Sequence, residues 1–428
     1  MSLSLKKADI LNPKKGNTSY NNRANWYDYY AGYSPKFALQ ILSSVGVKAK
    51  STVLDPWNGI GTTTLAASAL GVPAIGYDLN PVPVIVAKAL ILSTGEKQSI
   101  KPLLKEIIAK SSKFASGEVE PFLTWFDKDT CSHLRGIEKA VQFLLVEGSE
   151  EDRFILDDIE KVSEMASFFY VALFRTLRIL VDEFIGSNPT WVKKAKDNHL
   201  SFGRKIITSL FEGEVEKMLS DFEPIFSNRK WINPSLGIGD SMNILADECA
   251  VDFLLTSPPY CTRIDYGVYT MPELAVLGYD TKSNWSSLRS SLIGTTTVPE
   301  KSPAFDEQWG TTCSEFVEEL MNHTSKASQS YYLKNHLQYF EMMFKSVKEI
   351  SRVLKNGGGC ALVVQDSYYK EIHNNLPNIV AEMAANNGLN LFSKTNFKSV
   401  TNMAAVNPGT KKYRPQAEAT ESVLLFNK

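Results

Sequence analysis

The fold is decided by the stretch Val53-Leu54-Asp55-Pro56-Trp57-Asn58-Gly59-Ile60-Gly61-Thr62-Thr63-Thr64. An apolar run leads into a glycine-rich turn, and the small-residue run from Leu65 to Leu70 predicts a helix after it. A strand, a tight turn and a helix in this order let the backbone approach a nucleotide-like ligand closely, with the helix N-terminus facing it. The stretch therefore predicts the first strand, turn and helix of a nucleotide-binding sheet.

A second predicted strand, Ala74 to Asp78, ends in an acidic residue. Asp78 lies about twenty residues beyond the glycines, the distance at which such folds place an acid to accept the hydroxyls of a ribose. The glycine turn and Asp78 together predict a site for a ligand that contains a nucleoside.

A second motif, Thr256-Ser257-Pro258-Pro259-Tyr260, directly follows the apolar run Asp252 to Leu255. The strand must end there, because proline has no N–H to donate and fixes its own φ. The Ser257 hydroxyl and the rigid Pro258 carbonyl can converge on one amino group, and Tyr260 offers a flat face for stacking. These groups suit a planar heterocycle with an exocyclic amino group. Taken alone, the motif is also compatible with a strand-ending loop whose tyrosine packs on the core.

With these two motifs the chain resembles the S-adenosylmethionine-dependent DNA methyltransferases that modify exocyclic amino groups. The resemblance covers roughly residues 25 to 92 and 235 to 428. It implies S-adenosyl-L-methionine as the cofactor and double-stranded DNA as the partner, and it leaves open a cognate restriction endonuclease. The family's cofactor motif is matched here by Asp55, Pro56, Gly59, Gly61, Thr62 and Thr63, with Trp57 where the family usually carries phenylalanine.

The resemblance also assigns roles to other residues. Tyr30, in the segment Tyr30 to Phe37, is expected to help hold the methionine end, and Asp240, in Gly239-Asp240-Ser241, to contact the adenine amino group. The expected cofactor-binding residues are thus Tyr30, Asp55, Pro56, Trp57, Gly59, Gly61, Thr62, Asp78 and Asp240. The family's catalytic tetrapeptide is matched by Ser257, Pro258, Pro259 and Tyr260. Serine in its first place is typical of members that methylate cytosine N4, and Asp or Asn of those that methylate adenine N6.

Further elements alternate along the chain as α/β units do. Strands are predicted at Thr52–Leu54, Phe253–Leu255, Cys360–Val364 and Ser422–Phe426, and a helix from about Gln338 to Leu354 is expected to stop at the glycines that follow Lys355. Between Lys101 and Lys230 the periodicity is helical, with an apolar helix at Phe168–Phe184. The predicted fold is α/β, a doubly wound Rossmann-like methyltransferase sheet with a large helical insertion.

We expect three parts of the chain. Residues 1–100 hold the cofactor motifs, 101–230 form the helical insertion as a candidate DNA-recognition lobe, and 231–428 carry the catalytic motif with a recognition loop at about 261–330. Within that loop Ser283 to Pro303 is rich in serine and threonine, which predicts a mobile segment. Arg289 and Thr295 to Thr297 are its candidate DNA contacts.

Composition constrains the fold and the function less than the motifs do. The chain has 428 residues, a formal net charge of −1 and five cysteines without C-x-x-C spacing, so free thiols and no metal site are expected. No stretch approaches the length needed to span a bilayer, which predicts a cytoplasmic protein without a membrane partner. Basic residues gather before Arg23 and between Lys394 and Gln416, where they are either phosphate contacts or solvated side chains.

The sequence thus predicts a site-specific methyltransferase that flips its target base out of double-stranded DNA and methylates cytosine N4, within a restriction-modification or related defence system. Three alternatives stay open: an adenine-N6 DNA methyltransferase, an RNA base methyltransferase, and a DNA-binding specificity subunit without catalysis.

Overall fold

The structure is a computed structural model of the chain. It describes residues 10–14, 21–29, 32–114, 120–146, 159–186, 188, 190–226, 231–262, 264–281, 283–399 and 419–428. Among these residues, seven strands form one sheet in the order β3-β2-β1-β4-β5-β9-β8. Their bounds are β1 (Val53–Asp55), β2 (Ala74–Asp78), β3 (Ser235–Ile238), β4 (Val251–Thr256), β5 (Leu354–Gln365), β8 (Asn390–Ser399) and β9 (Ala419–Asn427).

Strands β1 to β5 run parallel to one another, while β9 is antiparallel to both β5 and β8. The side chains of the central strands alternate between two cores. Val53 and Leu255 pack with α1 (Pro35–Val45) and α2 (Thr62–Ala69) on one face. Leu54 and Leu254 pack on the other face with α11 (Thr311–Asn322), α12 (Leu333–Val353) and α13 (Leu376–Asn386). The predicted α/β, doubly wound sheet is confirmed.

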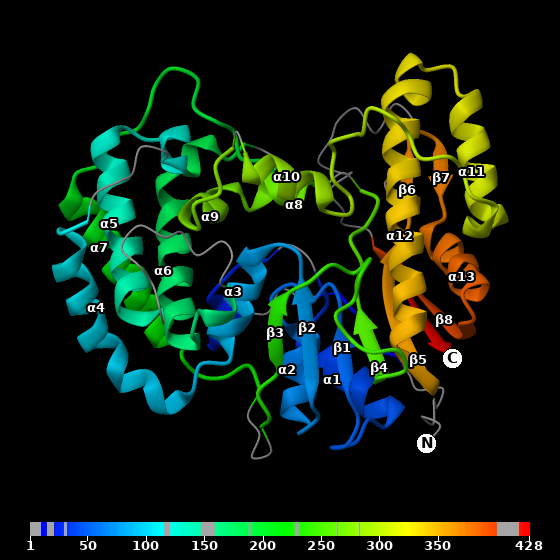
Figure 1. Cartoon of the computed structure of the whole chain (residues 1–428), viewed down its shortest axis with the longest axis horizontal. Coiled ribbons are helices and arrows are strands. Elements are labelled where there is room, and N and C mark those ends of the chain that lie inside the picture. The colour runs from blue at the N-terminus through cyan, green and yellow to red at the C-terminus, as the bar shows by residue number, and fades with distance from the viewer. Residues whose placement is uncertain are drawn as a thin grey trace.

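The long insertion between β2 and β3 is helical, as predicted. Its helices are α4 (Lys97–Ser111), α5 (Lys128–Leu145), α6 (Glu164–Leu180) and α7 (Arg204–Ser220). Phe168, Phe169 and Phe174 of α6 are fully buried, in one cluster with α3 (Pro81–Leu90). Figure 1 shows these helices gathered beside α3 at one end of the sheet, with α11 to α13 at the other. The division of the chain into three domains stays a prediction.

Three short helices, α8 (Tyr266–Tyr269), α9 (Met271–Val276) and α10 (Asn284–Ser291), follow the Ser-Pro-Pro-Tyr motif and lie between the two flanks (Figure 1). Two arginines of the helical insertion hold α9. Arg135 donates to the carbonyls of Ala275 and Val276 at 2.9 and 2.7 Å, and Arg178 pairs with Glu273 at 2.5 Å. The insertion therefore supports the segment that follows the motif.

Two local expectations are wrong. Helix α12 ends at Val353, one residue from the predicted end, but the glycines do not stop it, because β5 begins at once at Leu354. Gly357 and Gly358 lie within this strand because their backbone exchanges hydrogen bonds with Lys428 at the end of β9. The serine- and threonine-rich segment is not a loop throughout, because it contains α10, which the buried Trp285 anchors by donating from its indole nitrogen to the Gly267 carbonyl at 2.8 Å. Its mobility stays a prediction. Strand β8 and the hairpin of β6 (Ser367–Tyr369) with β7 (Ile372–Asn374) were not predicted.

Three expected absences concern only the part of the chain that the structure describes. No helix there is long and apolar enough to cross a membrane. The five cysteines are unpaired, and no group of three or more His, Cys, Asp or Glu side chains is arranged to hold a metal ion.

Candidate active site

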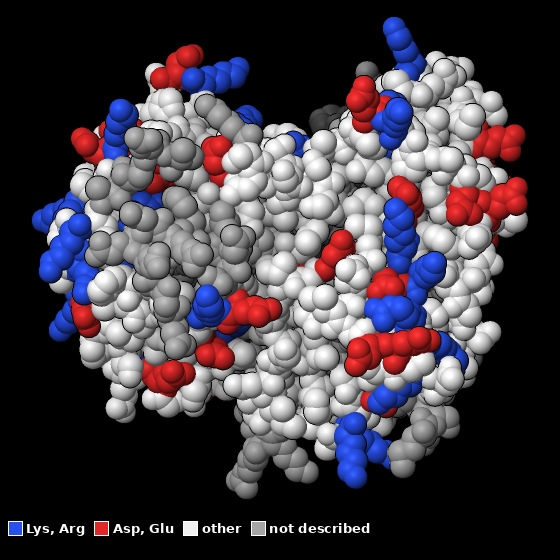
Figure 2. All heavy atoms as spheres, viewed as in Figure 1, with Lys and Arg blue, Asp and Glu red and all other residues white. Residues whose placement is uncertain are grey.

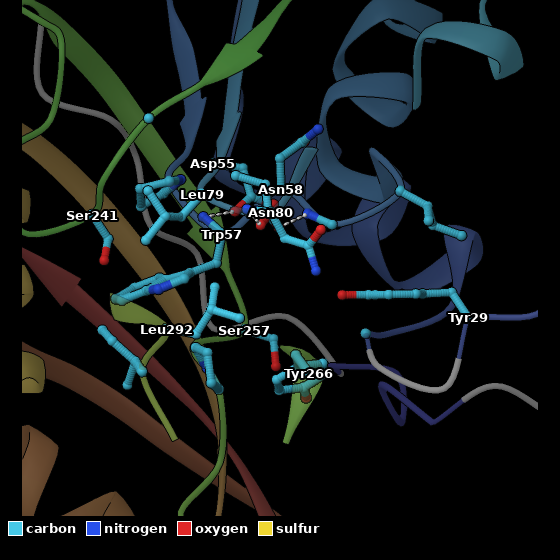
Figure 3. Close-up of a pocket in the computed structure, with 18 of the residues that line it drawn as sticks. Tyr29, Asp55, Trp57, Asn58, Leu79, Asn80, Ser241, Ser257, Tyr266 and Leu292 are labelled. Carbon is cyan, nitrogen blue, oxygen red and sulfur yellow. Dashed lines mark hydrogen bonds between the residues drawn. The ribbon is translucent and has the colours of Figure 1, made fainter. Parts of the chain in front are cut away.

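A pocket lies at the carboxyl ends of β1, β2, β3 and β4, where the two sequence motifs meet. Its walls include Asp55, Gly59, Asp78, Asp240, Ser257 and Pro259. Figure 3 shows Tyr29 and Trp57 on opposite sides of the pocket, with Ser257 across from Asn58 and Asn80. Residues about 200 positions apart in the sequence are thus brought to one cavity by the parallel pairing of β1 with β4.

Asp55 connects the two motifs directly. It is 3% exposed, and its Oδ1 accepts a hydrogen bond from the Thr256 hydroxyl at 2.6 Å and one from the Trp57 amide at 3.1 Å. Its Oδ2 accepts from the Thr63 hydroxyl at 2.6 Å. Burial raises the pKa of Asp55 to about 6, although these hydrogen bonds oppose the shift. One carboxylate therefore joins the turn after β1, the first turn of α2 and the residue before Ser257.

The turn after β1 depends on glycines. Gly59 and Gly61 have φ values of +50° and +88°, in the left-handed region that residues with a Cβ rarely adopt. Gly61 is the N-cap of α2 and offers no side-chain cap, so the first N–H groups of this helix are open to a ligand in the pocket that Thr62 lines. The turn places a helix N-terminus at the pocket, as the sequence predicts.

Asn58 packs this turn against β2. Its Oδ1 accepts from the Thr64 hydroxyl at 3.0 Å, and its backbone N–H donates to the Tyr77 carbonyl at 2.8 Å. The Asn58 side chain occupies the space above Gly76, where a Cβ would lie only 2.5 to 2.7 Å from its amide atoms. A glycine inside a strand often marks the close approach of a neighbouring group. Gly76 is therefore the residue from which this contact could have been predicted.

Asp78 closes the turn from the second strand. Its Oδ2 accepts from the Gly59 amide at 3.0 Å and its Oδ1 from the Asn80 amide at 2.9 Å. Burial raises the pKa of Asp78 to about 7. A carboxylate has about four acceptor positions, so both oxygens can still accept hydroxyl donors from the pocket.

Asn80 also lines the pocket, although the sequence analysis did not select it. Its Oδ1 caps α3 by accepting from Val82 at 3.1 Å, and its Nδ2 donates to the Thr270 hydroxyl at 2.9 Å. An asparagine before Pro81 is a typical helix N-cap, so this position could have been found from the sequence.

Four of the other expected cofactor-binding residues line the pocket. Pro56, Trp57 and Thr62 line the pocket, as does Asp240, whose Oδ1 accepts from the Met242 amide at 2.8 Å. Tyr30 lies outside the described residues. The neighbouring Tyr29 lines the pocket and lies against Gly59, where an added Cβ would be 3.2 Å from its ring.

The Ser-Pro-Pro-Tyr motif begins where β4 ends. Ser257 and Pro259 line the pocket, whereas Pro258 is buried and neither it nor Tyr260 belongs to the wall. The Ser257 Oγ lies 3.1 Å from both the Tyr260 hydroxyl and the Val363 carbonyl. The Tyr339 hydroxyl donates to the Pro259 carbonyl at 2.7 Å, which fixes the motif against α12.

The segment after the motif covers one side of the pocket with Tyr266 and the run Ser291 to Ile293. Asp265, which is 1% exposed, accepts from Arg289 at 2.8 Å and from the Thr296 hydroxyl at 2.7 Å. Two of the candidate DNA contacts are therefore part of an internal bond network that shapes this wall.

Comparisons with known proteins identify similar sequences. No protein-family profile matches the chain. Over 288 residues it is 27% identical to the Type II methyltransferase M.BsoBI of Geobacillus stearothermophilus, covering 60% of this chain and 53% of that protein. Over 403 residues it is 21% identical to the Type II methyltransferase M.AvaI of Nostoc sp., covering 86% of this chain and 79% of that protein. The chain thus spans about half the length of the first of these relatives.

Among solved structures, a protein from Galdieria sulphuraria assigned as a sarcosine dimethylglycine methyltransferase aligns over 92% of this chain and 83% of its own. The TM-score is 0.31 and the identity 9%. The fold assignment therefore stands on the order and direction of the strands themselves, and the similarity to known proteins stands on the two Type II methyltransferases.

The contact of Asn58 with Gly76 gives a prediction for stability. Gly76→Ala should lower the free energy of unfolding by about 1 to 3 kcal/mol, because the new methyl group overlaps the Asn58 side chain. Gly213→Ala is the matched control, since a Cβ there meets nothing within 4 Å and alanine favours the interior of α7 by roughly 0.5 to 1 kcal/mol. Urea denaturation of both variants checks this. Equal effects of the two substitutions would show that Asn58 does not need Gly76.

Proposed function

We propose that the chain is an S-adenosylmethionine-dependent DNA methyltransferase that acts on an exocyclic amino group. The observation that carries the proposal is that Ser257 lines the same pocket as Asp78 and the glycine turn. A methyl donor and an acceptor base must meet within one cavity for direct transfer. The hydrogen bonds to Asp55 hold the cofactor turn and the Ser-Pro-Pro-Tyr motif side by side in this cavity. The similarity to two Type II methyltransferases supports the same conclusion.

The residues of the pocket fit the cofactor. Asp78 has acceptor positions for the two ribose hydroxyls. The Oδ2 of Asp240, to which no described residue donates, can accept from the adenine amino group. Trp57 and Leu292 offer apolar contact to a flat ring. The open N-terminus of α2 suits the carboxylate of the methionine end. When bound, the cofactor supplies an electrophilic methyl group on a sulfonium sulfur.

The Ser-Pro-Pro-Tyr motif positions the acceptor nitrogen. The Ser257 hydroxyl and the Pro258 carbonyl would accept hydrogen bonds from its NH2 group, and no described residue donates a hydrogen bond to that carbonyl. These bonds draw electron density toward the nitrogen and hold it closer to tetrahedral geometry, which frees its lone pair for in-line attack on the methyl group. Stacking of the ring on Tyr260 stays a prediction, since Tyr260 does not belong to the wall of this pocket. Positioning and preorganised acceptors therefore supply most of the acceleration.

The choice of cytosine N4 rests on Ser257. A serine in the first place of the motif is typical of cytosine-N4 enzymes in the family that the chain resembles, so we propose cytosine as the target base, with adenine N6 as the alternative. The similarity to Type II methyltransferases supports a place in a restriction-modification system, beside an endonuclease of the same specificity.

Duplex DNA requires the target base to leave the stack before it can reach the pocket. The exposed Lys194 lies 5.2 Å from the centre of the Trp285 ring, and Arg289 lies at the same distance, so two cations gather at α10 beside the pocket wall. On the face in Figure 2, Lys and Arg are interspersed with Asp and Glu, and a hollow separates the two flanks at the upper edge.

Arg23 makes no phosphate contact, because it is 2% exposed and donates to three carbonyls. The basic residues between 400 and 418 lie outside the described residues.

The target atom can be measured directly. Plasmid DNA incubated with the protein and methyl-labelled cofactor should carry the label in N4-methylcytosine, as shown by mass spectrometry of its nucleosides. Label only in N6-methyladenine would retain the DNA methyltransferase and overturn the cytosine assignment. Label in RNA and not in DNA, with both offered together, would overturn the DNA assignment.

The raised pKa of Asp78 predicts how cofactor affinity depends on pH. The ribose hydroxyls donate to the carboxylate, but below about pH 7 the empty site holds a proton that binding must displace. The dissociation constant should therefore rise about tenfold between pH 7.5 and 5.5. Calorimetric titration of the parent and of Asp78→Asn checks this. The variant should bind the cofactor more weakly, and its dissociation constant should depend less on pH, even though it retains Asp55, whose pKa is also raised. A parent curve that is flat over this range would remove Asp78 from the ribose site.

Ser257 should affect the chemical step more than binding. Ser257→Ala should slow single-turnover methylation at least tenfold and leave cofactor affinity near the parent value, because the lost hydrogen bond strengthens as charge develops on nitrogen. The matched control is Ser43→Ala on the exposed side of α1. Parent-like rates in both variants would contradict the role of Ser257.

A further inference from the structure

A chain of hydrogen bonds leads from the Ser-Pro-Pro-Tyr motif to a carboxylate that neither motif contains. The Ser257 Oγ lies 3.1 Å from the Tyr260 hydroxyl, which donates to Oε1 of Glu421 at 2.8 Å. Tyr260 and Glu421 are 161 positions apart in the sequence. Three oxygen atoms thus form a continuous path from the pocket wall to an acidic side chain.

The sheet explains why Glu421 reaches this place. Strand β9 is antiparallel to β5, so its first residues lie at the edge where the parallel strands end. Glu421 pairs with Gln365 in this register, and Val423 pairs with Val363, whose carbonyl also lies 3.1 Å from the Ser257 Oγ. The antiparallel insertion of β9 therefore brings a carboxylate to the edge that holds the pocket.

The proposed reaction needs such an acceptor. As the amino nitrogen attacks, the N–C bond forms and the C–S bond breaks, and the positive charge that develops on the nitrogen requires one of its protons to leave during the transfer. A serine hydroxyl is too weak a base to keep that proton. The oxygens of Asp55 already accept from Thr256, Trp57 and Thr63, and Asp78 lies on the cofactor side of the turn.

Resting on the proposed function, we propose that Glu421 takes up the proton released by the methylated amino group, through Ser257 and Tyr260. The nitrogen gives its proton to the Ser257 Oγ, the Ser257 hydroxyl proton moves to the Tyr260 oxygen, and the Tyr260 proton moves to Glu421. Ser257 and Tyr260 are left as neutral hydroxyls and Glu421 as a neutral acid, so protons and charge balance. Glu421 acts through the other two and does not touch the substrate.

The surroundings of Glu421 favour proton uptake. Burial raises its pKa, while the hydrogen bond from Tyr260 and the charge of Lys14 lower it to a smaller extent. Tyr260 and Lys14 are the titratable groups that act on it among the described residues, and its strand neighbours Gln365 and Phe397 carry no charge. Burial of the neutral acid is less costly than burial of the carboxylate, so the same environment that holds Tyr260 also makes Glu421 a better base.

The test compares single-turnover methylation of DNA by the parent, Glu421→Gln and Tyr260→Phe between pH 5 and 8. Glutamine keeps an acceptor for the Tyr260 hydroxyl but cannot take a proton, and phenylalanine keeps the ring but breaks the path. Each variant should be at least about 100-fold slower than the parent, because general acid–base catalysis typically contributes roughly 100- to 10,000-fold. With cofactor at saturating concentration, so that protonation of Asp78 does not limit binding, the parent rate should fall at acidic pH, where Glu421 is already protonated, and Glu421→Gln should lose this fall. The double variant should be no slower than the slower single variant, because both break one path.

Two further variants separate proton transfer from a structural effect. Glu421→Asp should recover part of the rate and the acidic fall, because it restores a carboxylate. Glu341→Gln removes an exposed carboxylate of α12 that pairs with Lys345, and should keep the parent rate. Cofactor affinity of Glu421→Gln should equal that of the parent, since Glu421 does not line the pocket.

Parent-like rates and pH profiles in Glu421→Gln would overturn the relay while leaving the methyltransferase assignment intact. If Glu421→Gln lost cofactor affinity, a parent-like rate in Tyr260→Phe would overturn the relay in the same way. A parent enzyme that transfers no methyl group to DNA would overturn the proposed function and the relay with it.

Discussion

The buried carboxylate of Asp55 is the constraint on which the rest of the site depends. Its two oxygens accept from Thr256, Trp57 and Thr63, and so join the end of β4 to the turn and helix that follow β1. Hydrogen bonds to a buried carboxylate are stronger than those between neutral groups, and removing one donor leaves a costly unpaired acceptor. The distance between the cofactor turn and Ser257 is therefore set by side-chain bonds in addition to the pairing of β1 with β4.

The same edge of the sheet collects acidic groups with separate tasks. Burial raises the pKa of Asp55, Asp78 and Glu421 alike, but their partners differ. Asp55 is occupied by protein donors, Asp78 keeps acceptor positions toward the pocket, and Glu421 is reached from it only through Tyr260. In our account Asp55 holds the two motifs together, Asp78 binds the ribose and Glu421 receives a proton. The hydrogen bonds around each carboxylate decide its role.

The sequence predicts the local features well because each motif is a strand end with its own chemistry. The glycine turn, Asp78 and the strand end at Pro258 can be predicted from the sequence. Glycine marks left-handed φ values, Asp78 is an acidic residue at the end of a strand, and proline has no N–H to donate. The helical insertion is readable from its apolar period. Contacts set by tertiary pairing left no such trace: Glu421 reaches Tyr260 only through the register of β9 on β5, and the glycines after α12 join a strand because Lys428 bonds to them.

The central claim is that one pocket holds the methyl donor against the Ser-Pro-Pro-Tyr motif. A crystal structure of the protein with S-adenosylhomocysteine tests it most directly. Our account predicts both ribose hydroxyls within hydrogen-bond distance of Asp78, the adenine amino group at Asp240, and the sulfur atom facing Ser257. A ligand bound elsewhere, or bound here with its sulfur turned away from Ser257, would contradict the account.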